Sequence, residues 1–379
     1  MADGQGSVES VERMSLDFYR GKRVLLTGHT GFKGRWLSKI LLEAGAEVAG
    51  LALPPATPED EAVFKASGVA EGVRSYFGDV ADFAFVKHAF SEMRPEIVFH
   101  LAAQPIVLES YRNPVHTYAT NVMGTVHVLE CVRKSDSVRS VLNVTTDKVY
   151  RNNEWPWGYR ESDVLAGRDP YSNSKSCSEL VTESYRQSFL EQAGVAVSTA
   201  RAGNVIGGGD FAVNRIVPDC IRAALAGRTI EVRNPGSIRP YQHVLEPLFV
   251  YLMIAELQAQ DAAYAGAYNV GPEARDTVTT GELATLFCEA WGEGARWETH
   301  AVEQPHEAGL LRLDCSKLRS TFGWQPVWSI REAIERTVEW AKVHRDGSNI
   351  ADCMSQQIQA YEAAFQKMMK AGKDGKHTR

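Results

Sequence analysis

Cysteine is scarce in this sequence, and the few cysteines present form no pattern. The 379 residues include six cysteines, and no two of them stand in CxxC spacing. Scattered single cysteines argue against a disulfide framework and against a structural zinc site. We therefore expect no metal ion and a reducing, cytoplasmic environment.

Long runs of basic or of apolar residues are also missing. The formal net charge is -6, and Lys and Arg do not cluster before the last dozen residues, which we interpret as a solvated tail. A basic patch marks most nucleic-acid-binding proteins, so nucleic acid is not an expected partner. No stretch approaches the roughly 18 apolar residues of a membrane span, and the first residues are polar and acidic. We expect a soluble intracellular protein without a membrane partner.

Glycine is concentrated in one place where the chain needs it. Residues 22–53 show the pattern of a strand over 23–27, a turn with Gly28, Gly31 and Gly34, a helix and a second strand. In such a unit the first glycine allows the tight turn, the second lets backbone N–H groups approach a pyrophosphate, and the third lets the helix pack on the strand. The helix N-terminus then faces the anion. The pattern predicts a parallel sheet that binds a dinucleotide.

Further strand ends fit a flat cofactor. Asp79 follows one predicted strand, and the small residues Ala102 and Ala103 close another. A helix cap is the alternative role for Asp79. At the end of the second strand an acid would bind the adenosine ribose, but the chain has 51–53 "LAL" there and no adjacent arginine to favour a 2′-phosphate. NAD is favoured, and the residues alone leave NADP open.

A tyrosine and a lysine form a catalytic pattern. Tyr171 and Lys175 stand four residues apart on a predicted amphipathic helix, so both lie on one face. A neighbouring ammonium group, together with a nicotinamide cation, would lower the pKa of a phenol from its usual value of about 10 and make it a usable base. The pair therefore predicts proton transfer at this helix.

Ionisable residues also follow a buried strand directly. The run "VRSVLNV" ends at Val144, and Thr145, Thr146, Asp147 and Lys148 come next. Ionisable side chains are rarely left at such a position without a reason. A helix cap or a surface ion pair is one explanation, and acid–base chemistry is the other.

Together these motifs resemble the extended short-chain dehydrogenase/reductases. The "TGxxGxxG" turn and the "TTDK" segment are similar to those of the nucleotide-sugar 4,6-dehydratases, with lysine in place of the usual glutamate. The resemblance extends over most of the chain, to the members that act on CDP-glucose, through "EWPWGYRESD", "RAGNVIGGGDF", "NPGSIRPYQHVLEP" and "HEAGLLRLDCSKLRSTFGWQP". One departure is Leu108, followed by Glu109, where the resemblance would place an arginine.

The resemblance implies an activity and a role for each catalytic residue. Oxidation at C4, loss of water across C5 and C6, and reduction at C6 would convert CDP-glucose to CDP-4-keto-6-deoxyglucose for deoxysugar biosynthesis of the O-antigen type. Tyr171 would be the base at O4, with Thr146 hydrogen-bonded to the same oxygen and Lys175 on the ribose of NAD. Lys148 would remove the C5 proton, and Asp147 would protonate the departing O6 hydroxyl.

The same resemblance implies two sets of binding residues. Those expected at NAD are Gly28, Gly31, Phe32, Lys33, Gly34, Asp79, Val80, Leu101, Ala102, Ala103, Asn121, Tyr171 and Lys175. Those expected at the nucleotide sugar are Gln104, Asn204, Arg215, Arg239 and His306. Trp155 and Trp157 would either wall the sugar pocket or belong to the core.

The expected fold is α/β, a doubly wound parallel Rossmann sheet with a smaller mixed α/β substrate-binding domain. The predicted boundaries are 1–20 for an N-terminal arm, 21–200 for the dinucleotide-binding domain, 201–347 mainly for the nucleotide-sugar domain with segments that return to the Rossmann domain, and 348–379 for a C-terminal helix and flexible tail. The resemblance also implies a homodimer, in which the helices around 116–133 and the tyrosine helix form a four-helix bundle.

Other functions share part of this pattern. A dehydratase or a C4 epimerase for a different nucleotide sugar would use the same base, hydroxyl and cofactor, but Asp147 and Lys148 argue against simple epimerisation. A nonenzymatic NAD-binding regulator could keep the fold, but it would not need Tyr171, Lys175 and Thr146 together.

Overall fold

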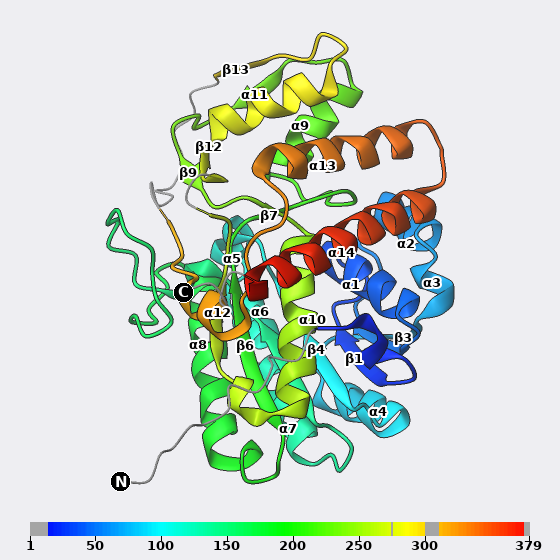
Figure 1. The fold of residues 1–379 in the computed structure, drawn as a ribbon, viewed down its shortest axis with the longest axis vertical. Helices are drawn as coiled ribbons and strands as arrows, with labels where there is room; N and C mark the ends of the chain where they lie inside the picture. Colours follow the sequence, from blue (N-terminus) through cyan, green and yellow to red (C-terminus); the bar gives the residue numbers. More distant parts are fainter. Residues whose placement is uncertain (1–13, 274–275, 300–310, 375–379) are drawn as a thin grey trace.

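The computed structural model describes residues 14–273, 276–299 and 311–374. Its main element is a seven-stranded parallel sheet in the order β11-β6-β5-β4-β1-β2-β3, with helices on both faces (Figure 1). Because the strand order runs in both directions from β1, the sheet is doubly wound. The predicted α/β class is confirmed.

The elements have the following bounds. The strands of the main sheet are β1 (Arg23–Thr27), β2 (Glu47–Ala52), β3 (Arg74–Phe77), β4 (Ile97–His100), β5 (Ser140–Val144), β6 (Ala196–Ala202) and β11 (Ala267–Val270). The shorter strands are β7 (Val205–Ile206), β8 (Ile230–Val232), β9 (Ile238–Arg239), β10 (Gln242–His243), β12 (Val278–Thr279) and β13 (Trp297–Thr299). The helices are α1 (Phe32–Glu43), α2 (Pro58–Ala66), α3 (Val69–Gly72), α4 (Phe83–Met93), α5 (Val107–Arg112), α6 (Pro114–Tyr118), α7 (Gly124–Arg133), α8 (Pro170–Tyr185), α9 (Ile216–Leu225), α10 (Leu245–Gln260), α11 (Thr280–Trp291), α12 (Ser316–Phe322), α13 (Ile330–Arg345) and α14 (Ile350–Asp374). Single turns are η1 (Leu16–Tyr19), η2 (Ala119–Met123), η3 (Asp147–Val149), η4 (Arg186–Leu190) and η5 (Ala262–Tyr264).

The strands of the sheet are buried on both faces because helices cover each side. In β1, Val24 and Leu26 belong to the core that includes α1 and α10, whereas Leu25 belongs to the core that includes α4 and α7. Alternate side chains of a strand point to opposite faces, so the period of two appears as membership of two cores. This explains why the strands read as continuous apolar runs in the sequence.

The tyrosine helix α8 begins at a well-defined point. Asp169 is its N-cap, and the carboxylate accepts a hydrogen bond from the backbone N–H of Ser172 at 3.0 Å. Pro170 occupies the first helical position, where its missing N–H is not needed. The cap therefore fixes Tyr171 in the first turn, directly beside the end of β5.

A smaller lobe lies above the carboxyl ends of the sheet strands (Figure 1). Its core contains side chains of α9, α11 and α13, together with Ile230 and Val232 of β8. The β8 strand pairs in parallel with β13. Two elements between residues 201 and 347 join the large sheet instead, since β11 is its edge strand and α10 packs on β5 and β6.

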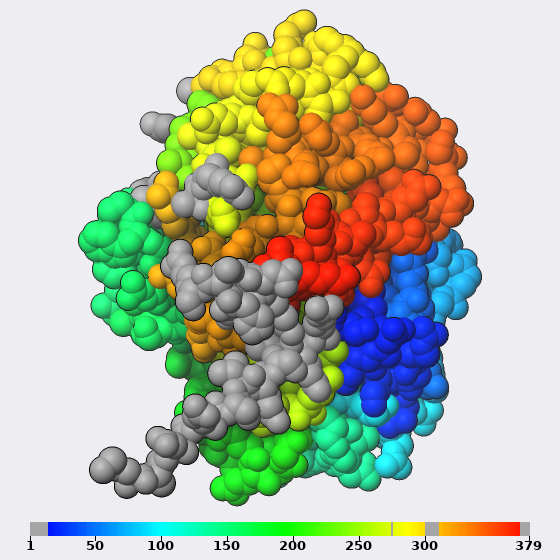
Figure 2. All heavy atoms as spheres, viewed as in Figure 1, coloured from blue at the N-terminus to red at the C-terminus, as the bar shows by residue number. Residues whose placement is uncertain are grey.

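The long helix α14 ties the two parts together. It lies against α1 and α2 on one side and α13 on the other, and Figure 2 shows its red surface meeting the blue N-terminal segment. The buried carboxylate of Glu246, on α10, accepts hydrogen bonds from the hydroxyl of Tyr361 at 2.7 Å and from the backbone N–H groups of Val327 and Trp328 at 2.9 and 2.6 Å. One acid thus anchors both α14 and the chain that precedes α13.

Candidate active site

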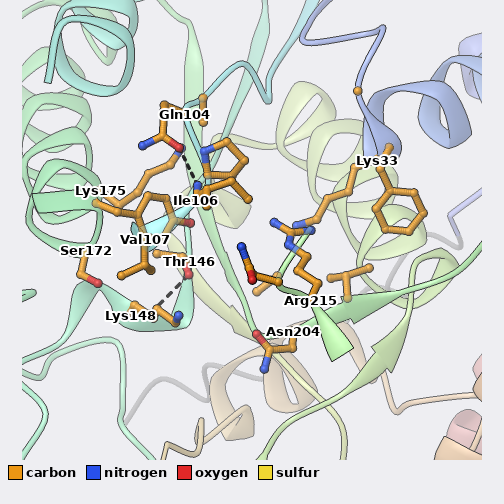
Figure 3. A pocket seen from close by; sticks show the side chains of 18 of the residues that line it. Lys33, Gln104, Ile106, Val107, Thr146, Lys148, Ser172, Lys175, Asn204 and Arg215 are labelled. Carbon is orange, nitrogen blue, oxygen red and sulfur yellow. Dashed lines mark hydrogen bonds between the residues drawn. The ribbon is translucent and has the colours of Figure 1, made fainter. Parts of the chain in front are cut away.

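A cavity of about 1270 Å³ lies between the sheet and the smaller lobe. Its walls come from the glycine turn after β1, the ends of β2, β4, β5 and β6, the start of α8, and residues of β8 and α9. Ligands of doubly wound sheets bind at the carboxyl ends of the strands, next to the point where the strand order reverses. Figure 3 shows side chains from both lobes entering this space.

The glycine turn has the shape that a pyrophosphate needs. Gly28 has φ +79°, and a Cβ there would lie 2.9 Å from the backbone nitrogen of Ala102. A Cβ on Gly34 would lie 2.0 Å from the carbonyl oxygen of Gly28, so helix α1 and the turn touch. Gly31 is exposed, and Gly28 O at 3.4 Å is the single neighbour within 4 Å of a Cβ there. The cradle predicted from the sequence is therefore present, and it fits the diphosphate of a dinucleotide.

The adenosine end of this cradle is apolar at β2. Ala52 and Leu53 line the cavity, as does Asp79 after β3. The carboxylate of Asp79 accepts a hydrogen bond from Ala81 N at 2.9 Å, and the N-cap of α4 is Asp82, so a helix cap is the wrong explanation for Asp79. Arg35 of α1 is buried and turned away in an ion pair.

That ion pair and its neighbouring hydrogen bonds keep Arg35 inside the protein. Arg35 Nη1 lies 3.0 Å from the carboxylate of Asp60 and 3.2 Å from the carbonyl oxygen of Thr30. Because its donors are used inside the protein, Arg35 is not placed to receive a 2′-phosphate.

Tyr171 and Lys175 meet at the cavity as the sequence predicts. Both side chains are almost completely buried and both line the cavity. Lys175 Nζ donates a hydrogen bond to the carbonyl oxygen of Val144 at 3.1 Å, at the end of β5. Burial lowers the pKa of the Lys175 ammonium to about 8, and the Glu179 carboxylate one turn further along opposes this shift.

The protein alone raises the pKa of Tyr171, whereas the lowering expected from the sequence also depends on the charge of the nicotinamide. Burial raises this pKa to about 12, against the hydrogen bond to Thr146 and the charge of Arg215, which lower it. Desolvation of a phenolate outweighs these effects because the ring lies inside the wall of the cavity. Within the protein alone, burial therefore keeps the phenol protonated at neutral pH.

The two ionisable side chains of the segment after β5, Asp147 and Lys148, have different surroundings. Thr146 is the N-cap of η3: its hydroxyl accepts from Lys148 N at 3.4 Å and donates to Asp147 Oδ1 at 3.0 Å. Lys148 is half-buried and lines the cavity, whereas Asp147 is 2% exposed. A surface ion pair is therefore the wrong interpretation of this segment, and the cap is the threonine rather than the acid.

Asp147 has an unusual environment. Its Oδ2 atom has no hydrogen-bond partner among the residues that the structure describes. Gly203 lines the cavity, and a Cβ there would lie 3.4 Å from this oxygen. Burial raises the pKa of the Asp147 carboxyl, although the charges of Lys148 and Arg239 act in the opposite direction. Asp147 itself is not among the residues that line the cavity, whereas its neighbours Thr146 and Lys148 are. A carboxyl group with a raised pKa directly behind the cavity wall is suited to hold a proton that it can donate.

The proposed substrate residues lie on the far side of the cavity. Asn204, Arg215 and Arg239 all line it, and Arg215 Nη1 forms an ion pair with Asp210 at 3.1 Å. His306 lies outside the described residues. Figure 3 shows Arg215 and Lys33 entering the same part of the space from different lobes.

The positive charges of Lys33 and Arg215 repel each other in this part of the cavity, although Asp210 partly offsets them. Burial lowers the pKa of Lys33 to about 8, and the positive charges of Arg215 and Lys175 act in the same direction. A phosphate between these groups would offset their repulsion. The geometry therefore fits an anionic ligand at the contact between the lobes.

Gln104 and Asn121 use their amides within the protein. Asn121 does not line the cavity: its Oδ1 accepts from Gln104 N at 2.8 Å, and its Nδ2 donates to Ser174 Oγ at 2.8 Å. Gln104 lines the cavity, but its Nε2 donates to Thr117 Oγ1 at 2.9 Å. Asn121 therefore holds the main chain at the cavity wall and does not border the space itself.

The two tryptophans do not wall the cavity. Trp155 stacks near Tyr159 with ring centroids 5.3 Å apart, and Trp157 is 61% exposed on the segment between η3 and α8. Leu108, at the position of the missing arginine, does line the cavity. An apolar side chain therefore borders the cavity where the resemblance would place a positive charge.

Several residues that structure the site were not singled out in the sequence. Asp210, the partner of Arg215, stands in the quoted stretch "GGGDF". Glu179 and Arg201 form a buried ion pair at 2.8 Å beneath the site. The position of Glu179 four residues after Lys175 is a signal that could have found it, because such residues share a helix face.

Neither a membrane-spanning helix nor a metal cluster is present in the described residues. Across the part of the chain that the structure describes, no helix combines the length and apolarity needed to cross a bilayer. In the same residues, no group of three or more His, Cys, Asp and Glu side chains is arranged to hold a metal ion.

Comparison with known proteins agrees with this geometry. The family model for GDP-mannose 4,6 dehydratase matches residues 25–337. A CDP-glucose 4,6-dehydratase from Salmonella typhimurium is 45% identical over 354 residues, which cover 92% of this chain and 98% of that protein. The structure of a Thermus thermophilus UDP-glucose 4-epimerase in complex with NAD is similar with a TM-score of 0.72 and 27% identity, over 84% of this chain and 99% of that one.

A fourth similarity concerns the fold alone. The structure of a Bacillus anthracis dTDP-glucose 4,6-dehydratase in complex with NAD has a TM-score of 0.71 at 19% identity, over 86% of this chain and 99% of that one. The seven-stranded sheet, the glycine turn, the tyrosine–lysine pair and the matched family model all agree. The chain therefore belongs to the GDP-mannose 4,6-dehydratase family of extended short-chain dehydrogenase/reductases.

Proposed function

We propose that this protein is an NAD-dependent nucleotide-sugar 4,6-dehydratase that converts CDP-glucose to CDP-4-keto-6-deoxyglucose. The observation that carries the proposal is Asp147, a buried carboxyl with a raised pKa and an oxygen without a partner among the described residues, next to Lys148 and Thr146. A simple oxidoreductase or epimerase has no use for an additional acid there. The similarity to the Salmonella typhimurium enzyme supports CDP-glucose as the substrate.

NAD is the proposed cofactor, and when bound it accepts the hydride from C4 and returns it to C6. The glycine cradle fits its diphosphate, and the NAD complexes of the similar epimerase and dehydratase support the choice over NADP. The residues proposed to hold it are Gly28, Gly31, Phe32, Lys33, Gly34, Asp79, Val80, Leu101, Ala102, Ala103, Tyr171 and Lys175, all of which line the cavity.

In the oxidation, Tyr171 removes the proton from the O4 hydroxyl of the sugar. Because burial raises its pKa to about 12, the phenol must first release its own proton to solvent, and the positive charges of bound NAD and of Lys175 would favour that ionisation. Thr146 hydrogen-bonds the reacting oxygens, and the Lys175 ammonium supplies positive charge on the same helix face. These two groups stabilise the phenolate as the proton moves.

In the elimination, the two ionisable residues of the segment act as a base and an acid. The ketone at C4 makes the C5 hydrogen acidic, and Lys148, which lines the cavity, removes it directly or through a water. Asp147 then donates a proton to the departing O6 hydroxyl. Its raised pKa is the direction that this role requires, since burial keeps the proton on the carboxyl.

The diphosphate of the substrate is proposed to lie between the lobes. Arg215 and Arg239 present guanidinium groups there, whose planar forks match phosphate oxygens, and Asn204 adds an amide. Gln104 borders the sugar. The nucleoside would then extend towards β8 of the smaller lobe.

The test is incubation with NAD and four nucleotide sugars: CDP-, UDP-, GDP- and dTDP-glucose. We expect a product with the alkaline ultraviolet absorbance of a 4-keto-6-deoxy sugar, and the highest kcat/KM for CDP-glucose. Preference for another nucleotide would change the substrate and keep the chemistry. Formation of a C4 epimer without the keto product would contradict the dehydratase assignment.

A homodimer is the proposed assembly, formed by α7 and α8 packing on the same helices of a second copy. Met123, Leu180 and Phe189, on these helices or on the turns that adjoin them, are 46%, 57% and 45% exposed. Exposed apolar side chains grouped on neighbouring helices favour a protein partner. Sedimentation should give twice the chain mass for the wild type and the chain mass for Leu180→Glu; a wild-type monomer would contradict the assignment.

We also propose a cytoplasmic location. All six cysteines are free, as expected of a protein kept in a reducing compartment. The deoxysugar product would serve biosynthesis of the O-antigen type.

A further inference from the structure

A buried network lies directly beneath the segment that carries the acid and base. Its centre is the ion pair of Glu179 on α8 and Arg201 on β6, whose side chains are 3% and 4% exposed. Glu179 Oε2 accepts from Arg201 Nη2 at 2.8 Å and from Thr199 Oγ1 at 2.8 Å. The other oxygen of the carboxylate accepts a hydrogen bond from the hydroxyl of Thr145. Neither group of the pair touches the cavity.

The arginine of this pair reaches the other end of the segment. Arg201 Nη1 donates to the hydroxyl of Tyr150 at 2.8 Å, and its guanidinium carbon lies 5.2 Å from the centre of the Tyr150 ring. The Tyr150 hydroxyl donates in turn to Asn269 Oδ1 at 2.6 Å on the edge strand β11. Tyr150 is 2% exposed, so these bonds are shielded from water.

The network therefore holds the segment at both ends. Thr145 precedes Thr146, and Tyr150 stands two residues after Lys148. The residues between them form a single turn, η3, whose last carbonyl oxygen, that of Val149, also accepts hydrogen bonds from Ser176 Oγ at 2.7 Å and Ala166 N at 2.9 Å. We propose that Glu179 and Arg201 are positioning residues for the elimination, which fix residues 146–148 relative to the sugar.

The energetics of buried ion pairs support a positioning role. Replacing such a pair by apolar residues is often neutral or stabilising, because removing two charges from water offsets their attraction. A pair that also bonds three neighbouring side chains restrains those side chains tightly. Acid–base chemistry needs this restraint, since a misplacement of about 1 Å can lower the rate by about 10²-fold.

The pair also affects Lys175 through its charge. The Glu179 carboxylate raises the pKa of Lys175, which burial holds at about 8. Two further ionisable groups interact with the charge of this lysine, His100 at the end of β4 and Lys33 on α1. Loss of the Glu179 charge leaves these groups unchanged and should lower the pKa of Lys175 further.

The experiment compares Glu179→Gln with the wild type, and it rests on the proposed function. We expect kcat with CDP-glucose to fall by about 10²-fold while KM stays nearly unchanged. At a pH below the lowered pKa of Lys175 oxidation at C4 continues, so enzyme-bound NADH should accumulate there in a single turnover. The alkaline limb of the kcat profile should move to lower pH. Arg201→Lys, which keeps the charge but not the fork, should also lower kcat.

Glu246→Gln is the matched control, because it neutralises another fully buried, hydrogen-bonded carboxylate away from the cavity. It should leave kcat unchanged. An equal fall of kcat in both variants, or wild-type kcat in Glu179→Gln, would overturn the inference. If Glu179→Gln does not fold, Thr145→Val removes one anchor alone and should show the same accumulation of NADH. A wild type that forms no keto product would instead contradict the proposed function.

Discussion

Asp147 and Glu179 are two carboxylates buried to almost the same degree, at 2% and 3% exposed. Glu179 accepts hydrogen bonds from two hydroxyls and forms an ion pair with Arg201 at 2.8 Å. Asp147 accepts a hydrogen bond from Thr146 at 3.0 Å, and its second oxygen has no partner in the described part of the chain. The two carboxylates are almost equally buried, but among the described residues only Glu179 has hydrogen-bond or ion-pair partners for both of its oxygens.

The difference shows how one protein keeps one carboxyl ready for chemistry and another inert. Desolvation raises the pKa of Asp147 because neighbouring cations compensate it incompletely. A carboxylate that is fully bonded, as Glu179 is, cannot reach a reacting atom without breaking those bonds. We therefore assign proton transfer to Asp147 and positioning to Glu179, an assignment that the following variants can break or sharpen.

The largest effect is expected for Tyr171→Phe, which removes the base that acts before either carboxylate. Without the phenol the O4 proton cannot leave, so neither oxidation nor elimination should proceed. NAD should still bind close to normally, as measured by fluorescence titration, because the ring is retained. Near-normal turnover would remove Tyr171 from the mechanism.

Asp147→Asn tests the comparison most directly. The amide keeps the size and hydrogen bonding of the carboxyl but has no transferable proton, so elimination should slow by about 10²–10⁴-fold. Bound NADH should accumulate, visible by its near-ultraviolet absorbance. Lys148→Met should show a related block, seen as loss of exchange of the C5 hydrogen with solvent deuterium.

The stability of Asp147→Asn should move in the opposite direction to its activity. The pKa of this carboxyl is raised in the folded state, so its contribution to stability is lost as the pH rises above the unfolded value. At neutral pH the neutral amide should therefore unfold at a higher temperature than the wild type, whereas Glu179→Gln should unfold at a lower one. Equal shifts of the unfolding temperature in the two variants would show that the two carboxylates do not differ in their hydrogen-bond and charge partners as proposed.

Glu246 gives a smaller effect, on stability and its pH dependence. Burial raises its pKa to about 7, although Tyr361 and two backbone N–H groups bond it. The unfolded group titrates at about 4.3, so its stabilising contribution is complete below that pH and is lost as the pH rises towards 7. Urea midpoints measured over this range should fall less in Glu246→Gln than in the wild type. An unchanged slope would contradict the assignment.

The smallest effect is expected at the surface pair of Arg94 and Asp136. The two groups lie 3.1 Å apart but are 65% and 81% exposed. Water screens such a pair, so Arg94→Gln should change the free energy of unfolding by under about 1 kcal/mol and leave turnover unchanged. A larger loss in a urea titration would show that exposure is a poor guide to the value of an ion pair in this protein.

Local sequence patterns predicted the parts of the site that depend on neighbours in the chain. The spacing of Gly28 and Gly34 and the four-residue step from Tyr171 to Lys175 both appear as expected, since a turn and a helix face are local geometry. No local pattern predicts the desolvation that raises the pKa of Tyr171 in the protein alone, because it depends on packing from distant segments. Neither role expected for Trp157, in the pocket wall or in the core, holds, because its exposure also depends on how distant segments pack.

The sequence by itself determined the βαβ unit with its nucleotide cradle, the tyrosine helix and the acid–base segment after β5, because each is specified by spacing along one element. The tertiary structure decided which buried carboxyl has partners that offset the loss of hydration. Glu179 meets Thr199 and Arg201 only when β6 lies beside β5, and Asp147 lies against Gly203 only in the folded chain. Burial and hydrogen bonding between distant segments set proton affinity, and no spacing in the sequence encodes them.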